Sequence, residues 1–515
     1  MKIFNSRLIF KLVFCLMVFT CISKNSYAQK QPNIVIIISD DHSYQTIGAY
    51  GSKLVKTPNI DRIAKEGVTF KKAYVTNSIC GPSRAVILTG KYSHINGFKD
   101  NETSQFDYTQ DSFVKQLQGG GYQTAWIGKQ HLGAKTAGFN YYTLLPGQGN
   151  YYNPDFIKMD GTKETVQGYV TNIIEDKAEK WLDERDQSKP FCIVIGHKAT
   201  HRTWIPDTTD FALYDKVKFP LPATFWDDYQ SRKAASIQDM SIAKTLVMGY
   251  DLKMFDNVPK GDGSINRMNA DQRAKFDAHY KPIEADFRAR NLTGKALVEW
   301  KFERYMRDYA STVASLDRNI GRTLDYLKKN NLDKNTVVIY MSDQGFYMGE
   351  HGWFDKRWMY EESFRTPMVM RYPGVIKAGS LNENMILNLD IAPTMLDIAG
   401  IKIPKDIQGA SFLPLVNGKS NKGRDAIFYH YYENGEHSVS PHFGVKTKRY
   451  KLIRFYKRVE GWELFDLQKD PREMHNVYED AAYQKLIPGL KKELNSLIDP
   501  YKDEDAKKIL AQNKL

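Results

Sequence analysis

The chain has 515 residues, of which 42% are hydrophobic and 13% aromatic, and its formal net charge is +13 at pH 7. This length exceeds a single minimal core and predicts one large domain and a smaller one. The composition is that of an ordinary globular protein, which excludes a repeat array or a long low-complexity tract. The basic balance favours polyanionic partners. Nucleic acid is not expected among them, because no recognisable nucleic-acid-binding motif is present.

Residues 1–28 have the pattern of a secretory signal peptide. Basic residues precede an apolar run at 12–22, and Ser26-Tyr27-Ala28 offers a small-x-small cleavage site. The run is too short for a membrane span, and no later segment could cross a bilayer. We therefore expect a periplasmic or secreted protein without stable membrane insertion, cleaved after Ala28. A lipoprotein anchored at Cys21 is a weaker alternative, because the residues before it fit that pattern poorly.

Cleavage at that site leaves two cysteines, Cys80 and Cys192. An exported protein with two cysteines has no disulfide framework. Cys192 lies in an apolar run at 191–196 that predicts a buried strand, so we expect it to be inert. Cys80 is accordingly not expected to be a bridge partner, and its role depends on its neighbours.

Continuous apolar runs predict buried strands at 32–39, 122–127, 191–195, 336–342 and 367–371. Helical patterns lie between them at 59–66, 112–118, 173–184 and 305–329. Alternation of strands and helices predicts an α/β fold with a parallel sheet covered by helices on both faces. In such sheets, ligands bind beyond the carboxyl ends of the strands.

The later part of the chain changes character twice. Residues 205–300 are polar, aromatic-rich and poorly periodic, and we interpret them as a long insertion near the mouth of the site. A stretch at 414–423 then separates a predicted catalytic domain, 29–418, from a C-terminal subdomain, 419–515. Short antiparallel strands are expected at 443–448, 450–455 and 462–465, and a terminal helix at 485–498.

Two acidic clusters follow predicted strands. Asp40-Asp41 ends the first, and Asp343-Gln344 ends the strand at 336–342. Adjacent carboxylates repel one another unless a positive charge lies between them, and this all-oxygen set suits a hard divalent cation. Because no thiolate cluster accompanies it and histidine is not prominent, calcium is favoured over zinc. For the Asp pair alone, a helix cap or a surface turn is the alternative.

The pentapeptide Cys80-Gly-Pro-Ser-Arg84 resembles the Cys-x-Pro-x-Arg signature of type I sulfatases. In that family a maturation enzyme oxidises the cysteine to formylglycine. The aldehyde hydrate carries two hydroxyls: one attacks sulfur, and the other later expels sulfate. By itself this signal is weak, since a lone cysteine is more often a small buried hydrophobe.

The resemblance extends along nearly the whole mature chain. Gly128-Lys-Gln-His-Leu-Gly133 is similar to the family's Gly-Lys-Trp-His-Leu-Gly, and Lys198-Ala-Thr-His201 to its Ala-Pro-His element. Ser342-Asp-Gln-Gly345 matches the second metal loop, where Asn or His is more usual than Gln344. Residues 464–473 resemble the C-terminal turn. The resemblance implies an alkaline-phosphatase-like α/β/α sandwich.

The resemblance also implies roles for individual residues. Lys129 and Lys356 would clamp the sulfate oxygens together with calcium, and Arg84 would hold the formylglycine hydroxyl and a metal-binding carboxylate. His201 would protonate the leaving sugar oxygen, and His131 would help the hemiacetal to collapse. The metal ligands implied are Asp40, Asp41, the converted Cys80, Asp343 and Gln344.

Residues 145–155 and 352–361 look like a branch that acts on N-acetylglucosamine 6-sulfate in glycosaminoglycans or mucins. In that branch Asp355 and Arg357 hold the sugar hydroxyls, and His442 reaches in from the second domain. The alternative for Asp355 and Arg357 is a local ion pair without ligand contact.

Three other functions remain open at this point. One is a sulfatase for a marine algal polysaccharide such as ulvan. Another is a phosphatase or phosphodiesterase of the same fold, although such enzymes use Ser or Thr and a His-rich two-zinc site, and this chain offers neither pattern. The third is a catalytically dead, basic glycan-binding protein, against which the intact set of charged residues argues.

Overall fold

The structure is a computed structural model that describes residues 31–133, 136–254 and 263–512. The predicted signal peptide lies outside the described residues, so it stays a prediction. Within the described part of the chain, no helix is both long enough and apolar enough to cross a membrane.

The core is a ten-stranded sheet in the order β11-β2-β10-β9-β1-β8-β4-β5-β6-β7. Its central strands are parallel to one another: β9 (Thr336–Ser342), β1 (Asn33–Ser39), β8 (Phe191–Gly196), β4 (Gln123–Gly128) and β5 (Tyr141–Leu144). Four of these five strands were expected from apolar runs, and those predictions are confirmed. Each run is apolar throughout because the strand is covered on both faces.

The predicted parallel sheet is confirmed for these central strands, whereas both edges of the sheet contain antiparallel pairs. β10 (Met368–Arg371) pairs antiparallel with both β9 and β2 (Val68–Phe70), and β11 (Ser380–Asn382) completes that edge. On the other side, β6 (Asp155–Lys158) and β7 (Lys163–Thr165) continue from β5 as an antiparallel meander. An apolar run predicts that a strand is buried but not the direction in which it runs. The sequence pattern therefore could not distinguish parallel from antiparallel pairing.

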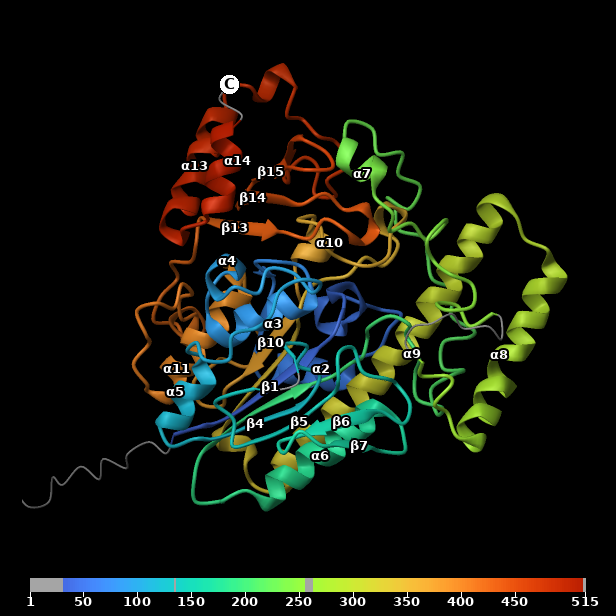
Figure 1. The fold of residues 1–515 in the computed structure, drawn as a ribbon, viewed down its shortest axis with the longest axis vertical. Coiled ribbons are helices and arrows are strands. Elements are labelled where there is room, and N and C mark those ends of the chain that lie inside the picture. The colour runs from blue at the N-terminus through green and yellow to red at the C-terminus, as the bar shows by residue number, and fades with distance from the viewer. Residues whose placement is uncertain (1–30, 134–135, 255–262, 513–515) are drawn as a thin grey trace, which may run out of the picture.

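Helices cover both faces of this sheet (Figure 1). Alternate residues of β1 point to opposite sides, since Val35 and Ile37 belong to one hydrophobic cluster and Ile34, Ile36 and Ile38 to another. The first cluster includes residues of α2 (Pro58–Lys65), α6 (Val170–Glu184) and α9 (Gly294–Lys329). The second includes residues of α3 (Cys80–Thr89), α5 (Phe113–Gly119) and α11 (Ile391–Ala399).

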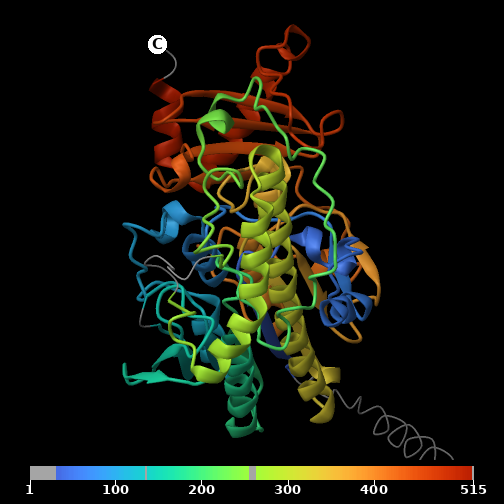
Figure 2. The ribbon, with the colours of Figure 1, turned by 90° about the vertical axis from the view of Figure 1, so that its right-hand side faces the viewer.

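The insertion at 205–300 contains helical structure that the sequence pattern did not predict. The 21-residue helix α8 (Ala270–Arg290) projects from the body beside the first half of α9 (Figures 1 and 2). Only Phe276 and Tyr280 of α8 are buried, so the helix lacks the apolar stripe on which such predictions depend. The usable signal was its capping box, formed by Asn269 and Gln272.

A four-stranded antiparallel sheet forms the C-terminal part (Figure 1), made of β13 (Ala426–Tyr431), β14 (His442–Thr447), β15 (Tyr450–Phe455) and β16 (Gly461–Asp466). It is followed by α13 (Ile487–Tyr501) and α14 (Glu504–Gln512). β13 and α14 were not expected. One hydrophobic cluster joins this sheet to Trp353 and Trp358 of the loop after β9, so the subdomain supports that loop. The boundary after residue 418 stays a prediction.

The carboxyl ends of β4 and β8 approach so closely that two glycines are required. Gly128 has φ +96°, and a Cβ on it would lie 2.1 Å from the Gly196 carbonyl oxygen. A Cβ on Gly196 would lie 2.1 Å from the Lys129 carbonyl oxygen. The Lys129 amide donates to the Gly196 carbonyl at 2.7 Å. The side chain of Lys129 is therefore positioned by a backbone contact that only glycine permits.

We predict that Gly128→Ala lowers the free energy of unfolding by about 2–5 kcal/mol, because it combines backbone strain with steric overlap. Chemical denaturation would measure it. Gly161→Ala is the matched control: Gly161 has φ +81°, and nothing lies within 4 Å of its added Cβ. The control should cost only about 1–2 kcal/mol. Equal losses for the two variants would contradict the close approach of β4 and β8.

Candidate active site

The predicted site residues come from consecutive strands of the central sheet. β9, β1, β8 and β4 are neighbours in that order, and their carboxyl ends carry, in the same order, Asp343-Gln344, Asp40-Asp41, His201 and Lys129 with His131. Because parallel strands end at one edge, motifs far apart in the sequence meet there. Cys80, at the first position of α3, and Lys356, in the loop after β9, complete the group.

The acidic residues form a compact cluster. Asp40, Asp41 and Asp343 are fully buried, and each offers a carboxylate oxygen within 4.8 Å of the others. The backbone amide of Asp41 donates to Asp343 Oδ1 at 3.2 Å, and Gln344 Nε2 donates to Asp41 Oδ1 at 2.5 Å. Asp40 Oδ1 and Gln344 Oε1 are buried without a hydrogen-bond partner. Oxygen donors with unused lone pairs fit a hard divalent cation.

The three carboxyls differ in acidity. Burial opposes the ionisation of Asp40, but Lys129 and Arg84 outweigh it and hold the pKa of Asp40 well below its usual value. For Asp41, burial outweighs the attraction of Lys356 and raises its pKa. Burial and the neighbouring Asp40 raise the pKa of Asp343 to about 7. A cation at this cluster would therefore favour the ionised form of every member.

Cys80 lies next to these acids at the amino end of α3, where negative charge is favoured. Its side chain is 1% exposed, and its sulfur lies within 4.8 Å of a ligand atom of Asp40 and one of His201. Burial and Asp40 raise the pKa of the thiol well above its usual value. The thiol is thus neutral at pH 7, and an unmodified Cys80 would be a poor nucleophile.

Three buried cations surround the cluster. Lys129 Nζ bonds Asp40 Oδ2 and Gln148 Oε1. Lys356 Nζ donates to Asp41 Oδ2 at 2.8 Å. Arg84 Nε donates to Asp343 Oδ2 at 2.9 Å and its Nη1 to the Lys129 carbonyl at 2.8 Å, so its planar fork links two strand ends.

Two histidines lie at the same edge. His201 Nε2 is 3.8 Å from Asp41 Oδ2, and its Nδ1 is 2.6 Å from the Arg202 carbonyl. Burial, with Lys129 close by, lowers the pKa of His201 well below its usual value, so the ring is neutral. Nδ1 then donates to the carbonyl, which leaves Nε2 to face the site. Burial and Lys129 also lower the pKa of His131 to about 3, and its Nδ1 is buried without a partner.

The residues on either side of Lys356 form a second polar group. Asp355 and Arg357 have φ +80° and +89°, an uncommon conformation that the surrounding contacts must impose. Arg357 Nε donates to Asp355 Oδ2 at 2.8 Å, and its Nη1 donates to Glu433 Oε2 at 2.7 Å. His437 Nε2 lies 3.4 Å from Asp355 Oδ2. The local ion pair therefore exists, but it belongs to a larger network that the C-terminal subdomain completes.

His442 does not belong to this network. Its Nε2 accepts from the Met359 amide at 3.1 Å and its Nδ1 donates to the Ser440 carbonyl at 2.8 Å, so both ring nitrogens are used. The ring is fully buried among aromatic side chains that include Trp358 and Phe455. These contacts support a structural role instead of the predicted contact with substrate.

Three polar residues near the cluster were not anticipated individually: Gln148, Glu433 and His437. Gln148 lies within the quoted stretch 145–155, but nothing in its spacing pointed to Lys129. Glu433 and His437 follow β13, a strand that the sequence pattern did not predict. Without that strand, their approach to the catalytic domain could not be inferred.

The Sulfatase family matches residues 32–401, and the family described as N-sulphoglucosamine sulphohydrolase, C-terminal, matches residues 349–500. The chain belongs to the sulfatase family. It is a sulfuric ester hydrolase with the α/β fold of that family, and formylglycine is typical of its members. The rival reading as a phosphatase or phosphodiesterase is thereby set aside.

Individual members of the family differ in how similar they are to this chain. The chain is 46% identical to an N-acetylglucosamine-6-O-sulfatase of Bacteroides thetaiotaomicron, over 94% of this chain and 89% of that one. A solved structure of a protein in complex with its substrate D-glucosamine-2-N,6-O-disulfate superposes with a TM-score of 0.90 at 46% identity, covering 92% of this chain and 99% of that one. An ulvan-active sulfatase of Formosa agariphila is 25% identical, over 96% of this chain and 84% of the other.

Proposed function

We propose that this sulfatase is calcium-dependent, carries formylglycine at position 80, and removes the 6-sulfate of N-acetylglucosamine or glucosamine units in glycosaminoglycan or mucin. The observation that carries the substrate assignment is the buried group of Asp355, Arg357 and His437 directly beside the clamp Lys356. Its support from relatives is the similarity to the N-acetylglucosamine-6-O-sulfatase and to the structure holding glucosamine disulfate.

The sulfate end of the substrate would lie against Cys80, Lys129 and Lys356. A sulfate ester presents three peripheral oxygens, and preorganised cations in a dry site stabilise the charge that develops on them. When bound, calcium would supply a fixed positive charge against one of these oxygens, held by Asp40, Asp41, Asp343 and Gln344. Formylglycine would supply a hydroxyl that attacks sulfur and a second hydroxyl from which sulfate is later expelled.

In this proposal His201 protonates the leaving group. Its neutral ring holds a proton on Nδ1 and presents Nε2 to the site. A bound sulfate ester adds negative charge beside the ring, which favours the imidazolium form. Nε2 can then donate a proton to the departing sugar oxygen, which would otherwise leave as an unstable alkoxide. His131, with an unpartnered Nδ1, is assigned to proton transfer in the release of sulfate.

Sugar recognition falls to the group on the other side of Lys356. Asp355 is ionised, because Arg357 and Lys356 outweigh its burial and hold its pKa well below the usual value. Its oxygens accept from sugar hydroxyls, while the guanidinium of Arg357 donates. A site of buried charged groups discriminates strongly against a sugar that lacks the matching hydroxyls, because those groups would then lie unpaired.

The proposal has consequences for the maturation and the export of the protein. Because the Cys80 side chain is 1% exposed, a maturase must reach the thiol before α3 packs into the core. Export to the periplasm or the exterior is proposed from the signal sequence alone. Ulvan or another algal polysaccharide is the less favoured substrate, since the ulvan-active relative is only 25% identical.

The nucleophile is tested by mass spectrometry. Protein produced with a maturase should carry a residue about 18 Da lighter than cysteine at position 80. Cys80→Ser should keep the fold and lose nearly all turnover, because a single hydroxyl cannot expel sulfate by elimination. Cys192→Ser, the matched control at the other buried cysteine, should stay active. Full activity with only unmodified Cys80 present would disprove the proposal.

The metal is tested by chelation and by pH. Burial and Asp40 raise the pKa of Asp343 to about 7, so the calcium-free protein should lose stability as the pH rises through that value. Calcium requires the ionised carboxylate, and its stabilising effect on Tm should therefore be larger near pH 8 than near pH 6. Chelation should abolish activity and calcium should restore it. Undiminished activity after thorough chelation would sink the assignment.

Acid catalysis and sugar recognition are separated by substrate choice. His201→Ala should impair sugar sulfates far more than an aryl sulfate, because a nitrophenolate leaves readily without a proton. Asp355→Ala should weaken saccharide turnover by about 1–3 kcal/mol per lost hydrogen-bonding partner and spare the aryl sulfate, which has no hydroxyls to hold. If Asp355→Ala reduced both substrates equally, Asp355 would belong to the structural shell, not to recognition.

A further inference from the structure

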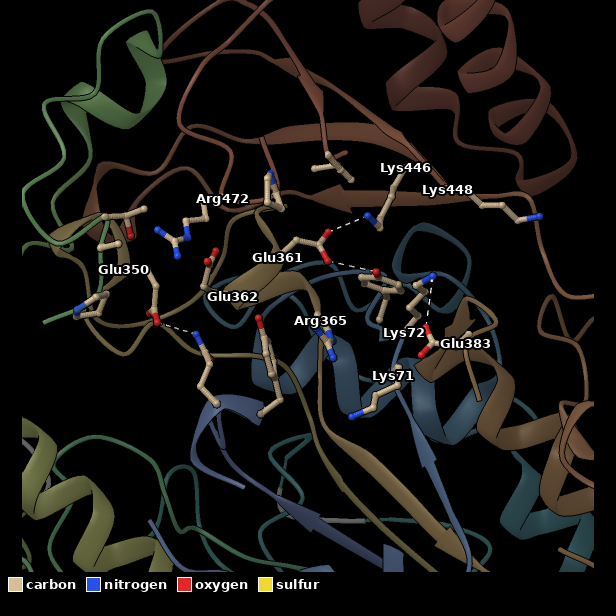
Figure 3. Close-up of a pocket in the computed structure, with 18 residues that line it drawn as sticks. Lys71, Lys72, Glu350, Glu361, Glu362, Arg365, Glu383, Lys446, Lys448 and Arg472 are labelled. Carbon is tan, nitrogen blue, oxygen red and sulfur yellow. Dashed lines mark hydrogen bonds and ion pairs between the residues drawn. The ribbon is translucent and has the colours of Figure 1, made fainter. Parts of the chain in front are cut away.

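A polar cavity lies between the catalytic domain and the C-terminal sheet. It is separate from the candidate active site, because none of the active-site residues lines it. Its volume is about 710 Å³. Its wall is formed by α10 (Glu361–Phe364), by the segment after β1 that carries Tyr44, and by the end of β14 (Figure 3). This volume lies within the range of pockets that hold small ligands and exceeds what a single inorganic ion occupies.

Most charged groups in this cavity are already paired. Lys446 contacts Glu361 at 3.0 Å, and Lys72 contacts Glu383 at 3.5 Å. Glu350 accepts from Gln45 at 2.7 Å. The dashed lines of Figure 3 mark these interactions. These groups are satisfied within the protein and need no ligand.

Three groups have no such partner among the described residues. Glu362 is 7% exposed and its Oε2 is buried without a hydrogen bond, although the residue lines the cavity. The guanidinium of Arg365 lies 4.2 Å from the centre of the Tyr44 ring, yet its Nε is buried and unbonded, and no carboxylate is within ion-pair distance. Arg472, at the exposed edge of the cavity, also has no ion pair.

The unpartnered groups indicate which chemical groups a ligand of this cavity would carry. A buried carboxyl such as Glu362 needs hydroxyl or amide partners, since leaving it unpaired costs free energy. Arg365 and Arg472 need an anionic group that can accept from a planar fork. Tyr44 and Tyr74 add aromatic side chains to the lining. Hydroxyls and an anionic oxygen cluster on one rigid body are the chemistry of a sulfated sugar.

We propose that this cavity is a second, non-catalytic binding site for a sulfated saccharide, with its hydroxyls at Glu362, its sulfate at Arg365, and Arg472 adding positive charge at the exposed edge. A metal fits less well, because no set of three His, Cys, Asp or Glu ligand atoms within the described residues converges here. The proposal depends on the proposed function only for the choice of sugar used as a probe.

The test uses the full-length Cys80→Ser protein, in which turnover is blocked. Isothermal titration with N-acetylglucosamine 6-sulfate should show two equivalents bound per chain. Arg472→Glu should weaken one of them by about tenfold. Lys329→Glu, which reverses an exposed charge at the far end of α9, should change neither. Arg365→Gln should remove the same equivalent, with its fold checked by thermal unfolding; if this variant does not fold, Arg472→Glu alone decides.

Inorganic sulfate and unsulfated N-acetylglucosamine serve as further probes. Each should bind the second site at least about tenfold more weakly than the sulfated sugar. If Arg472→Glu weakened no bound equivalent, the proposal would be overturned. Equally tight binding of inorganic sulfate would make the cavity an anion site only. If the active-site sugar assignment were wrong, the equivalent that is insensitive to Arg472→Glu would be missing while the sensitive one persisted.

Discussion

The structure of the site depends on how the charges of three buried acids are balanced. Asp40, Asp41 and Asp343 are fully buried within 4.8 Å of one another, an arrangement that is strongly unfavourable without compensating charge. Lys129 and Lys356 each bond one of the acids directly, and Arg84 bonds a third. Because every cation is itself buried, neither set can be removed without leaving the other unpaired. Loss of any member should therefore affect the whole group.

The backbone around these cations helps to fix their positions, although their side chains are long and flexible. Lys129 is held where two glycines let β4 and β8 meet, and Lys356 lies between two residues of positive φ. The C-terminal sheet stabilises that strained loop: Tyr429 donates to the Arg357 carbonyl at 2.5 Å, and Glu433 accepts from its guanidinium. The C-terminal subdomain thus fixes a loop of the catalytic domain. It does so without supplying His442 to the site, since that residue is bonded to backbone groups.

The sequence was sufficient for those features that have a strong local signal. Uninterrupted β-branched runs predicted β1 and β9, and the acidic residues after them had to meet because parallel strands end at one edge. Features that depend on tertiary contacts were not accessible. The helix α8 has no apolar stripe, and the direction of β10 is not encoded in its burial. His437 reaches Asp355 through a loop whose preceding strand was missed, so its contact with Asp355 could not be inferred.

Charge balance supports the proposal that a divalent cation prepares this site for an anionic substrate. When Asp40, Asp41 and Asp343 are all ionised, their charges cancel those of the three cations that pair with them, and Asp355 is likewise balanced by Arg357. A site with no net charge has little attraction for a sulfate ester, whose own negative charge must be desolvated on entry. A divalent ion on the unpartnered oxygens of Asp40 and Gln344 would make the site net positive and deprotonate Asp343. The excess positive charge would then lie at the carboxyl edge of the sheet beside Cys80, where the sulfate oxygens must be held.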